Sequence, residues 1–326
     1  MTGLTKKDQK HLMLFSGRSH PALANEVADL LGTELVPMRA VTYANSEIYV
    51  RFEESVRGSD AFVIQSHHAP VNEWLMEQLI MVDALKRASA KRITVVSPFY
   101  PYARQDKKHA GREPISARLV ADLYLAAGAS RVMSVDLHAA QIQGFFNGPV
   151  DHLHALPLLA DYVKEKYGDR DIVVVSPDAG RVRMADMWTD RLGCGLAIIH
   201  KRRDPNVANT VAVHEVVGDV EGKLCLLVDD MIDTAGTICL AADALKARGA
   251  AGVIAAATHP VLSGPAADRL NRSAFEEVIV TNTLPIPTGV KIDKLTVLSI
   301  APLLAKAIKA VFVESSVTSL MGENAG

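Results

Sequence analysis

Two adjacent acids followed by a loop of small residues are the clearest chemical feature of the sequence. The apolar run 224–228 leads directly into Asp229 and Asp230. Two residues later the chain continues with Asp233, Thr234, Ala235, Gly236 and Thr237. Carboxylates at the end of a buried strand can accept hydrogen bonds from sugar hydroxyls, and small residues let the N–H groups of a helix N-terminus surround an anion. The pattern therefore favours binding of a ribose and its phosphate.

An ordinary junction between a strand and a helix is the alternative interpretation of this segment, because Asp and Thr also cap helices. The common nucleotide-binding motifs do not help to choose. The sequence has no Gly-x-x-x-x-Gly-Lys-Ser/Thr, and no Gly-x-Gly-x-x-Gly follows a predicted strand. Other segments must therefore decide between the two interpretations.

Further polar residues follow other apolar runs. Arg104 and Gln105 stand in a turn that prolines stiffen, and His138 follows the run 131–136 after Leu137. Asp178 ends the run 172–176, and its carboxylate can hold Mg²⁺ directly or through water. Open α/β folds place their sites at the carboxyl ends of strands. These residues are therefore candidates for a site, although each one alone is equally typical of a surface turn, a helix cap or a satisfied histidine.

A basic triplet, Lys201-Arg202-Arg203, leads into the polar segment 204–209, which we expect to be a mobile surface loop. Cations on such a loop can close over a polyphosphate and stabilise charge that develops during phosphoryl transfer. A solvated basic turn is the alternative interpretation.

Short β-rich runs alternate with helical patterns along the chain. We predict strands at 12–15, 61–65, 92–97, 131–136, 172–176, 196–200, 224–229, 252–258 and 277–281. We predict helices at 22–31, 72–88, 115–127, 156–167, 181–191, 237–248 and 301–314. This alternation is typical of parallel α/β folds, and its course occurs twice. The predicted fold class is therefore α/β with two doubly wound parallel-sheet domains, at 1–153 and 154–326.

The composition narrows the classes of function. The formal net charge of -2 gives no broad cationic surface for nucleic acid. Three cysteines, Cys194, Cys225 and Cys239, lack metal-site spacing and fit a reducing compartment. No apolar run approaches the roughly 20 residues that a membrane span needs. We therefore expect a cytoplasmic protein that binds neither nucleic acid nor membranes.

Together these segments resemble the ribose-phosphate diphosphokinases, also called phosphoribosyl pyrophosphate synthetases, of the phosphate-activated class I. The likeness continues through 15–20, 54–58, 141–146, 257–260 and 278–283, so it spans nearly the whole chain. It implies that both domains are phosphoribosyltransferase-like and that the second carries the ribose 5-phosphate loop. It also implies the reaction, in which the C1 hydroxyl of ribose 5-phosphate attacks the β-phosphorus of ATP. The products are phosphoribosyl diphosphate and AMP, and the cofactor is Mg²⁺.

The resemblance also implies roles for individual residues. ATP would be bound by Tyr43, Asn45, Ser46, Glu47, Arg104 and Gln105, the first four of which reach a neighbouring subunit's site in that family. Ribose 5-phosphate would be bound by Asp229, Asp230, Asp233, Thr234, Ala235, Gly236 and Thr237. His138 and Asp178 would hold or orient the magnesium-nucleotide, and Lys201 and Arg203 would stabilise the transferring group. Activation by phosphate and inhibition by ADP would involve Ser55, Arg57, Arg112, Gln143, Ser316, Val317, Thr318 and Ser319. The active form would be a homo-oligomer, a hexamer built from three dimers.

Some positions depart from the family's usual residues. Arg181 stands where many members have glycine, and there it can add a cation that faces a phosphate. Asn45 and Ser46 stand where Asp and Gly are usual, and Tyr43 replaces a frequent Phe. A phosphoribosyltransferase would explain the acid pair but not the first half of the chain. A non-catalytic relative of the synthetases would leave the intact Lys201 and Arg203 without a use.

Overall fold

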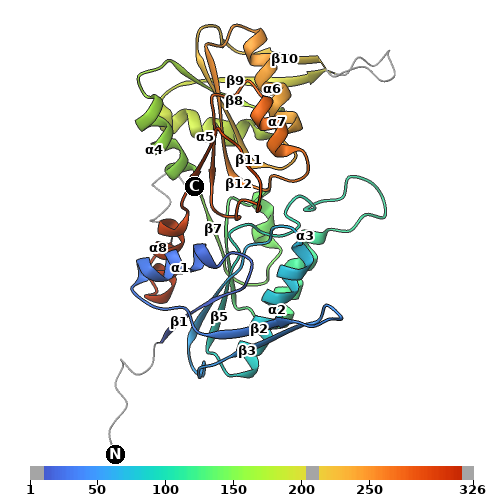
Figure 1. Cartoon of the computed structure of the whole chain (residues 1–326), viewed down its shortest axis with the longest axis vertical. Coiled ribbons are helices and arrows are strands. Elements are labelled where there is room, and N and C mark those ends of the chain that lie inside the picture. Colours follow the sequence, from blue (N-terminus) through green and yellow to red (C-terminus); the bar gives the residue numbers. More distant parts are fainter. Residues whose placement is uncertain (1–10, 203–212, 318–326) are drawn as a thin grey trace, which may run out of the picture. The chain divides into compact units, whose positions relative to one another are not determined.

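The chain forms two compact units, seen in a computed structural model that describes residues 11–202 and 213–317 (Figure 1). Among the described residues, the first unit contains 11–154, 283–285 and 299–317, and the second contains 155–202, 213–282 and 286–298. The predicted α/β class with parallel sheets is confirmed. The units do not follow the predicted halves throughout, because helix α8 (Ala301–Phe312) packs against α1 (Pro21–Leu31) of the first unit.

The first unit is built on a five-stranded sheet in which all neighbouring strands are parallel. Its order is β1 (Leu12–Ser16), β4 (Asp60–Ile64), β5 (Arg92–Val96), β6 (Arg131–Val135) and β7 (Val150–Leu153). The remaining elements are α1, α2 (Val71–Arg87), α3 (Ser116–Ala127), α8, the 3₁₀ helix η2 (Ala140–Gly144) and an antiparallel hairpin of β2 (Met38–Thr42) and β3 (Ile48–Phe52). The carboxyl ends of β5 and β6 lie side by side, so the segments that follow them emerge at one sheet edge.

Helix α2 shows how spacing decides burial. Leu75, Leu79 and Val82 lie on one face at the spacing of successive helical turns, and all three are buried in the core of the first unit.

Among the described residues, no helix is both long and apolar enough to cross a membrane.

The second unit is built on a seven-stranded sheet. Its order is β10 (Val213–Val217), β9 (Gly195–Arg202), β8 (Ile172–Ser176), β11 (Leu224–Ile232), β12 (Gly252–Pro260), β13 (Glu277–Thr281) and β14 (Leu295–Leu298). All neighbours are parallel except β9 and β10. Its helices are α4 (Leu156–Tyr167), the 3₁₀ helix η3 (Ala179–Arg181), α5 (Val182–Leu192), α6 (Gly236–Ala247) and α7 (Ala266–Arg272). From β8 the chain first moves outward to β9 and later returns to the other side of β8 as β11, so the strand order reverses between β8 and β11.

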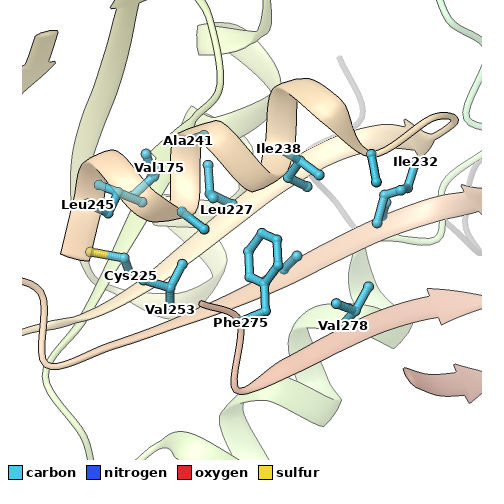
Figure 2. Packing of buried hydrophobic residues seen from close by; sticks show 14 of the residues in the cluster. Val175, Cys225, Leu227, Ile232, Ile238, Ala241, Leu245, Val253, Phe275 and Val278 are labelled. Carbon is cyan, nitrogen blue, oxygen red and sulfur yellow. The ribbon is translucent and has the colours of Figure 1, made fainter. Parts of the chain in front are cut away.

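Strand β11 lies in the middle of this sheet because its side chains can be buried on both faces. Leu226 and Leu227 point to opposite faces, and each has 0% of its surface exposed. Figure 2 shows Ile238 and Leu245 of α6 packed over Leu227 and its neighbours on one of these faces. The strand and the first turn of α6 are therefore held by a shared apolar core.

The buried carboxylate of Glu277 connects α4 to strand β13 of this sheet. Glu277, at the start of β13, accepts hydrogen bonds from the hydroxyls of Tyr162 and Tyr167 and from Thr296, and its side chain lies 2.8 Å from the ammonium of Lys166. Burial alone would raise the pKa of Glu277, but the bonds from Lys166, Thr296 and the two tyrosines outweigh burial and lower that pKa to about 2.

We expect the substitution Glu277→Gln to destabilise the protein at neutral pH by about 2 kcal/mol. The folded pKa of Glu277 lies below its value in the unfolded chain, so its stabilisation is complete above about pH 4.5 and is lost as the pH falls toward 2. Unfolding temperatures measured from pH 7 to pH 3 should therefore show a gap between wild type and variant that narrows below pH 4.5. The exposed Glu276→Gln is the control, and a gap independent of pH would contradict the prediction.

Candidate functional site

The acid pair lies where the strand order reverses. Pairing between β11 and β8 ends at Leu227, whereas pairing between β11 and β12 continues to Ile232. Asp229 and Asp230 therefore belong to a part of β11 that has lost its neighbour on the β8 side. Ligands of open α/β sheets bind in the crevice at such a point. The structure thus places the predicted acids at the carboxyl edge, inside the last part of a strand longer than predicted.

Arg181 compensates the two carboxylates. Its guanidinium lies 3.2 Å from Oδ1 of Asp229 and 2.7 Å from Oδ1 of Asp230, whose side chain is only 4% exposed. We expected Arg181 to face a phosphate, and in the structure it contacts the two acids. The side chain turns to the acids because two like charges in a covered position need an opposite charge nearby.

Each of the carboxylates Asp229 and Asp230 also disfavours the ionised form of the other. Burial and the Asp230 carboxylate raise the pKa of Asp229 to about 8, and the Arg181 guanidinium opposes this rise. Near neutral pH the pair therefore retains a proton. Such a pair can both donate and accept hydrogen bonds, which suits hydroxyl groups of a sugar.

The loop after β11 presents backbone N–H groups. Ala235 precedes α6 in a left-handed conformation with φ of 58°, and no side chain caps the helix there. The first N–H groups of a helix have no acceptor within the helix, so the first turn of α6 can receive an anion. The loop is held from outside, since the Arg269 guanidinium donates to the carbonyl of Thr234 and Ser263 donates to Asp233.

Asp178 has a structural role at the end of β8. Its Oδ1 accepts hydrogen bonds from the N–H groups of Gly180 and Arg181, at 2.8 and 3.1 Å, and it thereby caps η3. The helix cap considered as an alternative is thus present. The same cap orients the turn that carries Arg181 toward the acid pair.

In the first unit, Arg104 and Gln105 lie in the long connection between β5 and α3. Arg104 is exposed. Gln105 is anchored, because its side chain accepts from Ser116 at 2.5 Å and its carbonyl accepts from the N–H of Ala117. The start of α3 therefore fixes the position of this pair of residues.

Tyr43, Asn45, Ser46 and Glu47 form the turn between β2 and β3. The N–H of Tyr43 donates to the carbonyl of Glu47, and the Asn45 side chain accepts from the N–H of Glu47. Ser46 has a φ of 71°, a conformation that favours the glycine usual at this position. The ring of Tyr43 is half exposed at the tip of the hairpin. These hydrogen bonds hold the turn in its conformation.

His138 is half-buried and follows β6 by way of Asp136 and Leu137. Asp136 approaches His152 in the neighbouring strand β7 and His154 just after that strand, and donor atoms of these three residues lie within 4.8 Å of one another. Hydrogen bonding to Asp136 raises the pKa of His154 against the effect of burial. We did not predict this cluster from the sequence, although the spacing of two histidines around Leu153 in a polar strand is a signal for it.

Other expected site residues are only partly described. Lys201 is a backbone partner of His214 in the β9–β10 pair. Arg203, the expected surface loop 204–209, Thr318 and Ser319 lie outside the described residues.

Of the residues expected to bind effectors, two lie at one cavity of the described chain. Ser316 and Val317 line a cavity of about 590 Å³ in the first unit. Its wall includes Arg92 and Arg131, which begin β5 and β6, so the cavity lies at the amino edge of the sheet. Exposed positions outside this lining are Ser55, Arg57, Arg112 and Gln143.

We expect Asp229→Asn to stabilise the protein more at high pH than at low pH. The folded pKa of Asp229, about 8, exceeds the roughly 3.9 of an unfolded aspartate, so the folded state keeps a proton that the unfolded state releases. Stability from this group is therefore present below about pH 4 and is lost as the pH rises to 8. Relative to wild type, the unfolding temperature of the variant should rise by roughly 2–4 °C between pH 5 and pH 8.5. Asp243→Asn, on the exposed side of α6, is the matched control, and a constant difference across this range would refute the prediction.

Known proteins match the chain along its whole length. Residues 12–128 match the family model for the N-terminal domain of ribose phosphate pyrophosphokinase, and residues 204–322 match the phosphoribosyl synthetase-associated domain. A ribose-phosphate pyrophosphokinase of Streptomyces coelicolor is 66% identical over 323 residues, which cover 99% of this chain and 100% of the relative. That of Corynebacterium glutamicum is 61% identical and covers 98% of both chains.

A solved structure agrees. The crystal structure of phosphoribosylpyrophosphate synthetase from Mycobacterium smegmatis is 62% identical, has a TM-score of 0.89 and covers 93% of this chain and 99% of that chain. The match of the first half excludes the simple phosphoribosyltransferase considered above. With the acid pair, the small-residue loop and the N-terminal domain all accounted for, the chain belongs to the ribose-phosphate pyrophosphokinase family.

Proposed function

We propose that the acid pair and the loop of α6 bind ribose 5-phosphate in the reaction of this family. The enzyme transfers the diphosphoryl group of ATP to ribose 5-phosphate, making phosphoribosyl diphosphate for nucleotide synthesis. The C1 hydroxyl attacks the β-phosphorus of ATP, the bond from that phosphorus to the bridging oxygen of the α-phosphate breaks, and AMP leaves. The hydroxyl proton is released. The observation that carries the assignment is the acid pair beside uncapped helix N–H groups at the reversal of strand order.

This geometry supports the proposed ribose 5-phosphate site. The first N–H groups of α6 and the hydroxyls of Thr234 and Thr237 receive the 5-phosphate. Asp229 and Asp230, which together retain a proton, bind ring hydroxyls of the ribose. Little covalent chemistry is required of the protein, so holding the C1 hydroxyl in line with the phosphorus carries much of the catalysis.

ATP is assigned to residues of the first unit. Arg104 offers an exposed cation, and Gln105 is anchored to α3 beside it. Lys201 and Arg203 stabilise the negative charge that builds on the transferring diphosphoryl group. The exposed ring of Tyr43 offers a stacking surface for adenine at the tip of its hairpin, together with Asn45, Ser46 and Glu47.

Of the candidate donor atoms on Asp178 and His138, only some suit Mg²⁺. One carboxylate oxygen of Asp178 already serves the η3 cap, which leaves the other for a cation or its water. His138 offers nitrogen, a poorer donor for a hard cation, so it is better suited to orienting the nucleotide phosphates or a bound water. When bound, Mg²⁺ neutralises phosphate charge. We assign Asp178 to hold it and His138 to orient the magnesium-nucleotide.

Regulation, assembly and location complete the proposal. Phosphate and ADP act as effectors through the residues named above, among which Ser316 and Val317 border a cavity with arginine side chains. The free cysteines suit the cytoplasm. The protein works as a homo-oligomer, a hexamer, in which the Tyr43 hairpin completes a neighbour's site.

We expect Lys201→Ala to lower kcat by about 100-fold or more while leaving the KM for ribose 5-phosphate nearly unchanged, because charge on the diphosphoryl group grows toward the transition state. The measurement is AMP formed from ATP and ribose 5-phosphate in the presence of Mg²⁺. Lys223→Ala, which removes a surface lysine paired with Asp219, is the control. An unchanged kcat would remove Lys201 from the mechanism, and a wild type that forms no AMP would contradict the reaction itself.

We expect a mixture of two poorly active variants to regain activity if the hairpin serves a neighbouring subunit. Tyr43→Ala damages the donated hairpin, and Lys201→Ala damages the receiving site. Dissociation and joint reassembly should then create some sites in which both parts are intact. No gain over the separate variants, with mixed oligomers demonstrated by mass, would show that the hairpin acts within its own chain.

A further inference from the structure

The backbone between β6 and His138 is held in an unusual conformation. Asp136 has a φ of 37°, in the left-handed region that residues other than glycine seldom adopt. Such a conformation persists only where surrounding contacts hold it. His138 follows two residues later, so the path of Asp136 and Leu137 determines where the His138 ring can lie.

The contacts that hold this segment come from β7 and the residue after it. The N–H of Asp136 donates to the carbonyl of Leu153 at 2.8 Å. On either side of Leu153 a histidine makes a further bond, since Nε2 of His152 accepts the N–H of Leu137 at 2.9 Å and Nδ1 of His154 lies 3.0 Å from Oδ1 of Asp136. Three successive residues therefore bind two successive residues of the neighbouring segment.

The pattern fixes both rings. Nε2 of His152 carries no proton because it accepts the N–H of Leu137, and this bond sets the orientation of the ring. The two rings also contact each other, with centroids 4.3 Å apart. A metal bound by this cluster would have to compete with the bonds to Leu137 and Asp136, so the geometry favours a hydrogen-bonded clamp.

We propose that His152 and His154 are positioning residues that hold Asp136 and Leu137 and thereby fix His138 for the magnesium-nucleotide. The proposal rests on the role of His138 assigned under the proposed function. It assigns to these two histidines a part in the reaction although neither contacts substrate. Positioning groups of this kind commonly affect a site's affinity by roughly 10- to 100-fold.

Paired substitutions test the clamp. Leucine at either position removes the ring nitrogen that makes the hydrogen bond. An amide side chain can replace that nitrogen. In His152→Gln the amide oxygen Oε1 takes the place of Nε2, and in His154→Asn the amide nitrogen takes the place of Nδ1. We expect His152→Leu and His154→Leu to raise the KM for Mg-ATP by about 10-fold or more, with the KM for ribose 5-phosphate changed less than about twofold. The amide variants should recover most of the loss. His11→Leu, exposed at the amino end of β1, is the matched control.

Each alternative outcome has a clear meaning. The clamp is refuted if the leucine variants bind Mg-ATP normally, or if both KM values and the unfolding temperature change together in leucine and amide variants alike. It is also refuted if the purified protein carries one equivalent of a transition metal that the leucine variants lose. A wild type without AMP formation would instead refute the proposed function, and a fully active His138→Ala would refute the role of His138.

Discussion

The pairing of two covered carboxylates with one arginine is the constraint on which the second unit depends. Asp229 and Asp230 follow each other in β11, and uncompensated negative charge there would oppose folding. Arg181 reaches them only because the Asp178 cap turns η3 toward β11. This orientation of η3 requires that β8 and β11 are neighbours and that their pairing ends before β11 does. The strand reversal, the cap and the arginine therefore form one arrangement around the acid pair.

The strands that could be predicted from the sequence are those buried on both faces. β4, β12 and β13 are covered at every position, so they appear as continuous apolar runs. The strands that were missed, β2, β3, β7, β10 and β14, lie at edges or in the hairpin, and the burial of β2, β3, β7 and β14 is partial along most of their length. Short, half-covered strands carry too few apolar residues to differ from loops. The short helix α7 was missed for the same reason.

The residues of the candidate site also include some that could be predicted from the sequence and some that could not. Asp178, His138 and the acid pair could be found because each follows an apolar strand, and strand ends meet at one edge. The contact of Arg181 with the acid pair could not be predicted, because the direction of a long side chain depends on charges that folding brings near it. The histidine clamp was also missed. The register of β6 with β7 pairs His152 with Ser134 and so brings its ring within reach of the N–H of Leu137, and register is a tertiary property.

Helix α8 gives the chain an unusual order of assembly. Figure 1 shows α8 beside α1, although nearly the whole sequence separates them. Both helices carry buried residues, among them Leu23 and Val27 of α1 and Leu304 and Ile308 of α8. A ribosome makes the chain from its N-terminus at about 5–20 residues per second, so α1 emerges long before its partner. During that interval α1 lacks its contacts with α8, and the first unit is completed only after the second has been synthesised.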